Sequence, residues 1–129
     1  MSISEFGAWA MTNNIDAVEF GGIWEAAWNR RDVEAVLPHF AEDAVFTSPV
    51  AQQVGFAEDG VVRGKDALRQ YWLTALQKNP GLRFRVTAVY RGVDTVVIAF
   101  QNQHGVDRLE ILRFANGVVV EGHGTFIAR

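Results

Sequence analysis

Two charged residues near the end of the chain, Arg108 and Glu110, have the types and spacing for proton-transfer chemistry. They stand in an apolar stretch that predicts a β-strand, and alternation along a strand places Arg108, Glu110 and Leu112 on one face. If that face points inward, a carboxyl group with an arginine beside it lines an apolar cavity. Such a carboxyl group could act as a general acid or base.

The dipeptide His104-Gly105 predicts a two-residue hairpin turn, which sets Gln101 opposite Arg108. We therefore interpret Glu110 as the catalytic acid or base for an apolar, carbonyl-bearing or cyclic molecule that Arg108 and Gln101 orient. A structural interpretation stays open beside it. In that case Arg108 and Glu110 form a partly buried ion pair that sets the sheet register, and the chain is a ligand-binding or dimerisation module without chemistry.

Several aromatic side chains are candidates for the wall of the cavity, although core packing would explain them equally well. The candidates are Trp24, Phe40, Phe46 and Trp72. Ser48 could offer a hydrogen bond to a ligand, but no paired histidine and acid make it a nucleophile. Phe126 shares the inner face of the last strand with Gly122 and Gly124, whose missing side chains leave room for a ligand or allow a bend.

The composition excludes many other kinds of site. The chain has no cysteine, so disulfides, thiolate metal sites and cysteine nucleophiles are ruled out. No two of the three histidines have metal-ligand spacing on one face, and no glycine-rich phosphate loop precedes a helix. We expect no metal and no cofactor.

Charge and hydropathy limit the partners. The formal net charge of −3 and the lack of a basic cluster argue against binding to nucleic acid. No apolar run reaches the roughly 20 residues that span a bilayer, and the first residues lack the pattern of a signal peptide. We expect a cytoplasmic protein that does not contact membranes.

The elements that position these residues begin with helices. A length of 129 residues fits one domain, 1–129. We expect the first residues of this domain, 1–12, to form an N-terminal arm. After the possible caps Asn13 and Asn14, apolar steps of three and four predict a helix with one aromatic face. Gly21 and Gly22 weaken this helix, so we expect another element to approach it closely.

Further helices and strands follow with the spacing typical of each. Helices are predicted over Val33–Phe40 and Lys65–Lys78. Residues 50–63 are predicted to form a long loop or a loose hairpin, and such loops often act as lids. The predicted strands are Ala44–Ser48, Leu82–Tyr90, Thr95–Gln103, Val106–Ala115 and Gly117–Ile127. The last strands carry apolar residues on both faces, so helices would cover one face and a second copy of the chain the other.

This order of elements resembles the nuclear transport factor two-like superfamily, and in particular its SnoaL-like members. The resemblance covers about residues 16–126. It is carried by Ala27-Trp28-Asn29, Asp32, the stretch from Phe40 to Phe46, Ser48-Pro49, Gly64, Ala67-Leu68, Tyr71-Trp72, Arg108, Glu110, Phe114 and Asn116-Gly117. It implies an α+β cone in which three N-terminal helices pack on a curved, mostly antiparallel sheet and enclose a pocket.

The superfamily includes ketosteroid isomerase, polyketide cyclases, limonene epoxide hydrolase and scytalone dehydratase, together with pocket proteins without chemistry, so fold alone does not decide function. By resemblance, Ser48 stands where the isomerases carry their aspartate base. Trp24 and Glu110 stand at the positions of their oxyanion partners, while Phe40 and Trp72 replace two tyrosines. Steroid isomerisation by that mechanism is therefore not expected.

The Arg108-x-Glu110 pair resembles part of the epoxide-hydrolase site, but a second aspartate has no counterpart here. The resemblance thus implies a SnoaL-like protein that binds a small molecule. It is either a cofactor-independent isomerase, cyclase or hydratase or a binding module, and we expect a homodimer.

Overall fold

A computed structural model describes residues 15–129, so the predicted arm over residues 1–12 lies outside the described part. The helices are α2 (Ala17–Asn29), α3 (Val33–Val36), the 3₁₀ helix η1 (Leu37–His39), α4 (Pro49–Gln53) and α5 (Lys65–Lys78). The strands are β1 (Phe40–Thr47), β2 (Val61–Arg63), β3 (Arg85–Arg91), β4 (Thr95–Gln101), β5 (Asp107–Ala115) and β6 (Val118–Gly124). None of these helices is long and apolar enough to cross a membrane.

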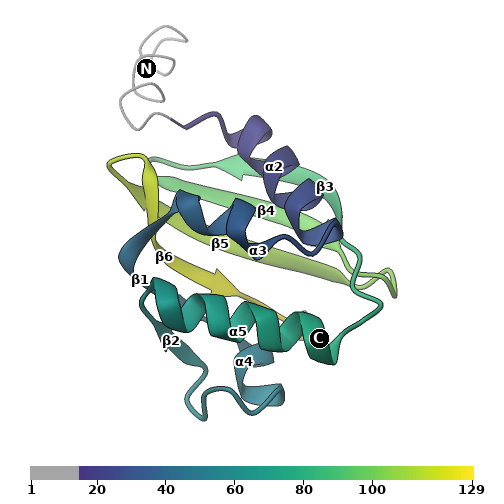
Figure 1. Cartoon of the computed structure of the whole chain (residues 1–129). Helices are drawn as coiled ribbons and strands as arrows, with labels where there is room; N and C mark the ends of the chain where they lie inside the picture. Colours follow the sequence, from purple (N-terminus) through teal and green to yellow (C-terminus); the bar gives the residue numbers. More distant parts are fainter. Residues whose placement is uncertain (1–14) are drawn as a thin grey trace, which may run out of the picture.

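The strands form one six-stranded sheet in the order β2-β1-β6-β5-β4-β3 (Figure 1). Strands β1 and β6 run parallel, and every other neighbouring pair is antiparallel. The register shifts within three of the pairings, β1 with β6, β3 with β4 and β5 with β6. Such irregularities bend strands, which explains how this sheet curves.

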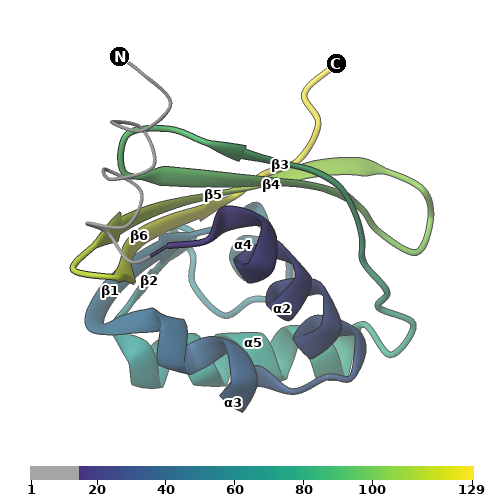
Figure 2. The same cartoon turned by 90° about the horizontal axis from the view of Figure 1, so that it is seen from above.

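Helices α2, α3 and α5 lie together on one side of the sheet, and no described helix covers the other side (Figure 2). Burial follows this layering. On β4, Val96, Ile98 and Phe100 are buried under the helices, whereas the alternate residues are only partly covered. The predicted α+β architecture with a curved, mostly antiparallel sheet is confirmed.

Helix α2 starts at a side-chain cap and packs closely on the sheet. The cap is Asp16, whose Oδ1 accepts a hydrogen bond from the backbone of Glu19 at 3.0 Å, so Asn13 and Asn14, outside the described residues, are not needed for it. A Cβ built on Gly21 would lie 2.8 Å from a methyl group of Val89. The close approach expected at the glycine pair therefore occurs at Gly21.

The second predicted helix, Val33–Phe40, is too long. Its α-helical part ends at Val36, and Pro38 lies in the 3₁₀ turn that follows. Proline fits the first positions of a helical turn but not its interior. The chain then turns extended, so that Phe40 begins strand β1 and no longer belongs to a helix.

The predicted loop over residues 50–63 contains regular structure. The hydroxyl of Ser48 caps the short helix α4 by accepting from the backbone N–H of Val50 at 3.1 Å. Further on, β2 pairs with β1 at the edge of the sheet. The pairing of β2 depends on the rest of the fold, whereas the start of α4 has a local signal in Ser48-Pro49 that the prediction did not use.

Candidate functional site

A cavity of about 340 Å³ opens between the sheet and helices α2, α4 and α5. Seven of the residues predicted for the site lie in its wall: Trp24, Phe46, Ser48, Trp72, Arg108, Glu110 and Phe126. The sequence also missed several wall residues, among them Tyr71, Phe84 and Phe100. Tyr71 could have been noticed, because a tyrosine on the apolar face of a helix usually needs a polar partner.

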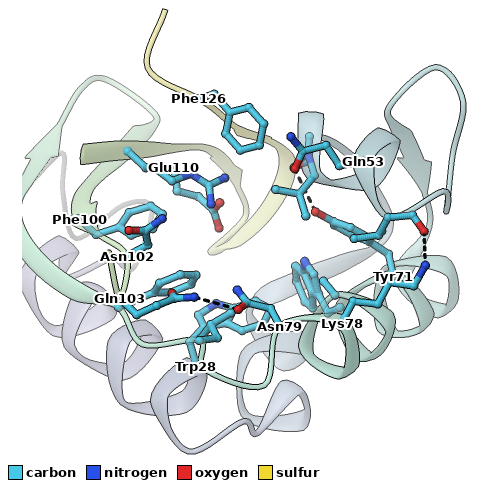
Figure 3. A pocket seen from close by; sticks show the side chains of 18 of the residues that line it. Trp28, Gln53, Tyr71, Lys78, Asn79, Phe100, Asn102, Gln103, Glu110 and Phe126 are labelled. Atoms are coloured by element: carbon cyan, nitrogen blue, oxygen red, sulfur yellow. Dashed lines mark hydrogen bonds between the residues drawn. The ribbon is translucent and has the colours of Figure 1, made fainter. Parts of the chain in front are cut away.

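Glu110 provides the acidic group of the cavity. Its side chain points inward from β5, which is the condition that the sequence alone left open, and the residue is only 8% exposed. The indole N–H of Trp24 donates a hydrogen bond to its Oε2 at 3.2 Å. Figure 3 shows Glu110 facing Tyr71 across the pocket.

Burial controls the titration of this carboxyl group. Loss of water raises the pKa of Glu110 to about 7, although Arg108 and the hydrogen bond from Trp24 act in the opposite direction. Near neutral pH both protonation states are therefore populated. The group can accept a proton in one state and donate it in the other.

Two hydroxyl groups line the opposite wall. The hydroxyl of Tyr71 donates to Ser48 Oγ at 3.0 Å, and burial raises the pKa of Tyr71 to about 12, so it stays protonated. Ser48 Oγ also accepts from the backbone of Val50. Because a serine oxygen accepts two hydrogen bonds and donates one, its own hydrogen remains available to a ligand.

Gly124 on β6 separates Ser48 from Glu110. A Cβ at this position would lie 3.1 Å from Ser48 Oγ and 3.7 Å from Glu110 Oε1. A side chain at this position would therefore crowd the hydroxyl group of Ser48. At Gly122 a Cβ would meet the ring of Phe46 at 2.7 Å, so that glycine serves packing.

Arg108 lies nearer the mouth of the cavity and does not pair with Glu110. Its Nε donates to the carbonyl of Thr125 at 2.8 Å, and its guanidinium carbon lies 4.9 Å from the ring centroid of Phe126. No ion pair within residues 15–129 joins Arg108 to Glu110. The direct ion pair of the structural interpretation is therefore not formed.

The prediction for Gln101 is wrong. The connection between β4 and β5 is longer than two residues, which sets Gln101 opposite Asp107 and Phe100 opposite Arg108. Gln101 consequently points to the outer side of the sheet, where it bonds Arg85 and Asp107. It takes no part in the cavity.

Two other predicted binding residues lie behind the wall. Phe40 packs edge-on against Trp72, with ring centroids 5.1 Å apart, and Leu112 has no exposed surface. Both belong to the core that supports the cavity. Strand alternation placed Leu112 on the correct face, but its depth depends on how the helices close over it.

The mouth of the cavity is polar. Lys78 Nζ donates to the carbonyl of Val54 at 2.8 Å, which ties the end of α5 to the segment after α4. Gln103 Nε2 donates to Asn79 Oδ1 at 2.8 Å, which links the β4–β5 connection to the residue after α5 (Figure 3). Part of the predicted lid segment thus borders the opening.

Aromatic rings form the apolar wall on the side of α2. Trp24 stacks on Phe84 with centroids 5.3 Å apart and meets Phe100 edge-on at 4.9 Å. Trp28 and Trp72 meet edge-on at 5.4 Å. The cavity therefore combines an aromatic wall on the side of α2 with polar groups on its other sides.

Fold and site together define a cone-shaped α+β pocket protein of the nuclear transport factor two-like type. The model of the SnoaL-like domain family matches residues 23–129, and the chain belongs to that family. No curated protein is detectably similar in sequence.

Solved structures agree with this family. A SnoaL-like protein of unknown function from Burkholderia thailandensis is 33% identical, with a TM-score of 0.79 over 87% of this chain and 94% of that one. A putative polyketide cyclase from Sinorhizobium meliloti is 13% identical, with a TM-score of 0.67 over 86% of this chain and 100% of that one. A nuclear transport factor two-like protein of unknown function from Burkholderia pseudomallei is 20% identical, with a TM-score of 0.68 over 89% of this chain and 91% of that one. At 13% and 20% identity, the last two support the fold alone.

Proposed function

We propose that this protein is a cofactor-independent isomerase, cyclase or hydratase that uses Glu110 to move a proton on a small carbonyl-bearing or cyclic molecule. The observation that carries the proposal is the state of Glu110. A carboxyl group that lines an apolar cavity and has a pKa of about 7 is poised to exchange protons at neutral pH.

The reaction begins with the ionised form of Glu110. Its carboxylate removes a proton from the carbon next to a substrate carbonyl, and the C–H electron pair moves onto the carbonyl oxygen as an enolate. The free hydroxyl hydrogen of Ser48 is close enough to the same space to stabilise that oxygen. Glu110, now protonated, is the acid for the second half of the reaction.

The enolate can react further in two ways, and each is balanced in atoms and electrons. In an isomerisation the substrate is a β,γ-unsaturated carbonyl compound, so the enolate is conjugated with a second double bond. Glu110 then returns the proton to the γ-carbon, and the double bond moves next to the carbonyl group. In a cyclisation, the enolate carbon attacks a second carbonyl of the same molecule, a carbon–carbon bond forms, and Glu110 protonates the new alkoxide. Neither route consumes an oxidant, a reductant or a nucleotide.

The common first step can be tested without the natural substrate. We would follow exchange of the α-protons of 2-tetralone for deuterium by NMR, with wild type, Glu110→Gln and the surface control Glu42→Gln. Glu110→Gln should lose roughly 100-fold or more of the catalysed rate, since general base catalysis contributes about that much. Equal rates for wild type and Glu110→Gln would refute the proposal.

The second candidate is a non-catalytic binding module. The aromatic wall favours it, because rings such as Trp24, Phe84 and Phe100 bind flat ligands without any proton transfer. This candidate predicts tight binding of aromatic ligands that is unchanged in Glu110→Gln, together with no catalysed exchange for any enolisable ketone.

We also propose that the protein acts as a homodimer in the cytoplasm. Strands β3 and β5 present the exposed apolar residues Tyr90 and Leu109 on the side of the sheet that no described helix covers. A second copy of the chain would bury this surface and protect the sheet.

A further inference from the structure

We propose that the substrate of this pocket is an aromatic or alicyclic carboxylic acid whose carboxylate binds to Arg108 at the mouth of the cavity. The inference deepens the proposed function and rests on it for the identity of the reacting end, which lies at Glu110. It adds the chemical class of the molecule and the way in which it is oriented.

The first observation concerns the free bonding capacity of Arg108. Its Nε is occupied by the carbonyl of Thr125, at 2.8 Å. The two terminal nitrogens have no hydrogen bond or ion pair with any residue in the described range 15–129. A guanidinium group with both terminal nitrogens free presents the fork that matches a carboxylate.

The second observation is that this fork is held in a fixed orientation. The ring centroids of Phe126 and Phe100 lie 4.9 and 5.6 Å from the guanidinium carbon, and Nε donates a hydrogen bond to the carbonyl of Thr125. Two aromatic contacts and one hydrogen bond restrict the rotamers of a long side chain before any ligand arrives. Less conformational entropy is then lost on binding.

The third observation is an imbalance of charge around the cavity. Its wall contains Lys78 and Arg108 as cations, and Glu110 is the one carboxylic acid among the wall residues of the described chain. Since burial keeps Glu110 partly protonated at neutral pH, the wall is positive although the whole chain has a formal charge of −3. Burial lowers the pKa of Arg108 although the nearby Glu110 acts in the opposite direction, so the charge of Arg108 is costly to hold here, and a bound carboxylate would relieve that cost.

The arrangement also sets the length of the molecule. Arg108 and Glu110 are neighbours on the same face of β5, a separation of about 7 Å along the strand. The carboxylate would thus lie at the mouth, and the reacting carbon one or two rings deeper, between Glu110 and Ser48. A cavity of about 340 Å³ holds a molecule of that size.

The test compares two probes of equal shape, 2-naphthoate and 2-naphthamide, by isothermal titration calorimetry at pH 7. Wild type should bind the acid roughly tenfold or more tightly than the neutral amide, as expected for one charge-assisted hydrogen-bonded pair. Arg108→Met should remove this preference and leave the affinity for the amide within about twofold. Arg108→Lys should recover only part of it, because an ammonium group lacks the fork.

Two control variants locate the effect. Lys78→Met removes a cation at the rim that already bonds a carbonyl, and it should change the affinity for 2-naphthoate by less than about twofold. Ile127→Ala alters a separate hollow on the outer side that also borders Arg108, and should have no effect. A loss of affinity in Ile127→Ala equal to that in Arg108→Met would overturn the assignment to the cavity.

The main comparison remains decisive if a variant misfolds. Equal affinities of wild-type protein for the acid and the amide would overturn the proposal, with no variant needed. Failure of the proposed function is distinguishable, because Glu110→Gln would then leave proton exchange unchanged while the preference for 2-naphthoate persisted. Loss of the preference with exchange retained would reject only the carboxylic acid.

Discussion

The indole N–H of Trp24 donates a hydrogen bond to the Oε2 of Glu110, which lies 3.2 Å away and 86 positions later in the sequence. This contact joins the first described helix to the centre of the sheet. It places a neutral donor on a buried carboxyl group, so it stabilises the ionised form without adding a charge.

Removing that donor should therefore change the titration of Glu110. In Trp24→Phe a smaller aromatic ring replaces the indole and the hydrogen bond is lost, so the pKa of Glu110 should rise further above its usual range. The pH at which the exchange rate reaches half of its maximum should move upward, and stability should fall by about 1–2 kcal/mol. Trp72→Phe, a matched loss at a tryptophan that does not bond Glu110, should leave the pH profile in place. A profile unchanged in Trp24→Phe would contradict the role of the contact.

The raised pKa of Glu110 predicts how stability depends on pH. Folding raises this pKa from 4.5 to about 7, so the folded state binds the proton more tightly. The resulting stabilisation is fully present below pH 4.5 and is lost as pH rises through 7, a change on the order of 3 kcal/mol. The free energies of unfolding of wild type and Glu110→Gln can be measured by urea denaturation at pH 5 and pH 8. The difference between the two proteins should shift in favour of the variant at pH 8. A difference in unfolding free energy that does not depend on pH would show that folding does not shift the pKa of Glu110.

Ser48 and Tyr71 should behave as a coupled pair. Tyr71→Phe and Ser48→Ala each remove one partner of a buried hydrogen bond and should each cost about 1–2 kcal/mol. The double variant should cost less than the sum of the two, by roughly 0.5–1 kcal/mol or more, in a double-mutant cycle of unfolding free energies. Strict additivity would mean that the two hydroxyls do not interact in solution.

Gly124→Ala should disturb the polar end of the cavity. The new methyl group would lie 3.1 Å from Ser48 Oγ, close enough to force this hydroxyl group to shift, so the affinity for 2-naphthoate should fall roughly tenfold or more. Gly22→Ala is the matched control, since a Cβ there meets nothing within 4 Å. It should leave binding unchanged and stabilise α2 by up to about 1 kcal/mol. Wild-type affinity in Gly124→Ala would place the ligand elsewhere.

The proposed dimer can be tested at Leu109, which is 42% exposed on the uncovered side of the sheet. Leu109→Asp should convert a dimer to a monomer in light scattering coupled to size exclusion, because a charge on an apolar interface is costly to bury. Val18→Asp introduces the same charge at an exposed apolar position of α2 and should leave the mass unchanged. A wild-type protein that runs as a monomer at micromolar concentration would end this proposal.

Local patterns in the sequence predicted the order of most elements and the face that Glu110 shares with Arg108 and Leu112. Alternation along a strand depends only on backbone geometry, so Arg108, Glu110 and Leu112 share a face wherever the strand lies. Helical spacing predicted α5 over Lys65–Lys78, with the same ends that the structure has. These features require no knowledge of distant contacts.

Tertiary structure decided what these side chains meet. Gln101 points away from the site because the connection between β4 and β5 is longer than two residues. Phe40 belongs to β1 because it pairs with β6. The hydrogen bond between Tyr71 and Ser48 and the pKa of Glu110 both depend on helices closing over the sheet. Burial and hydrogen bonding between residues far apart in the chain are properties of the packed molecule, and the local spacing of residues does not predict them.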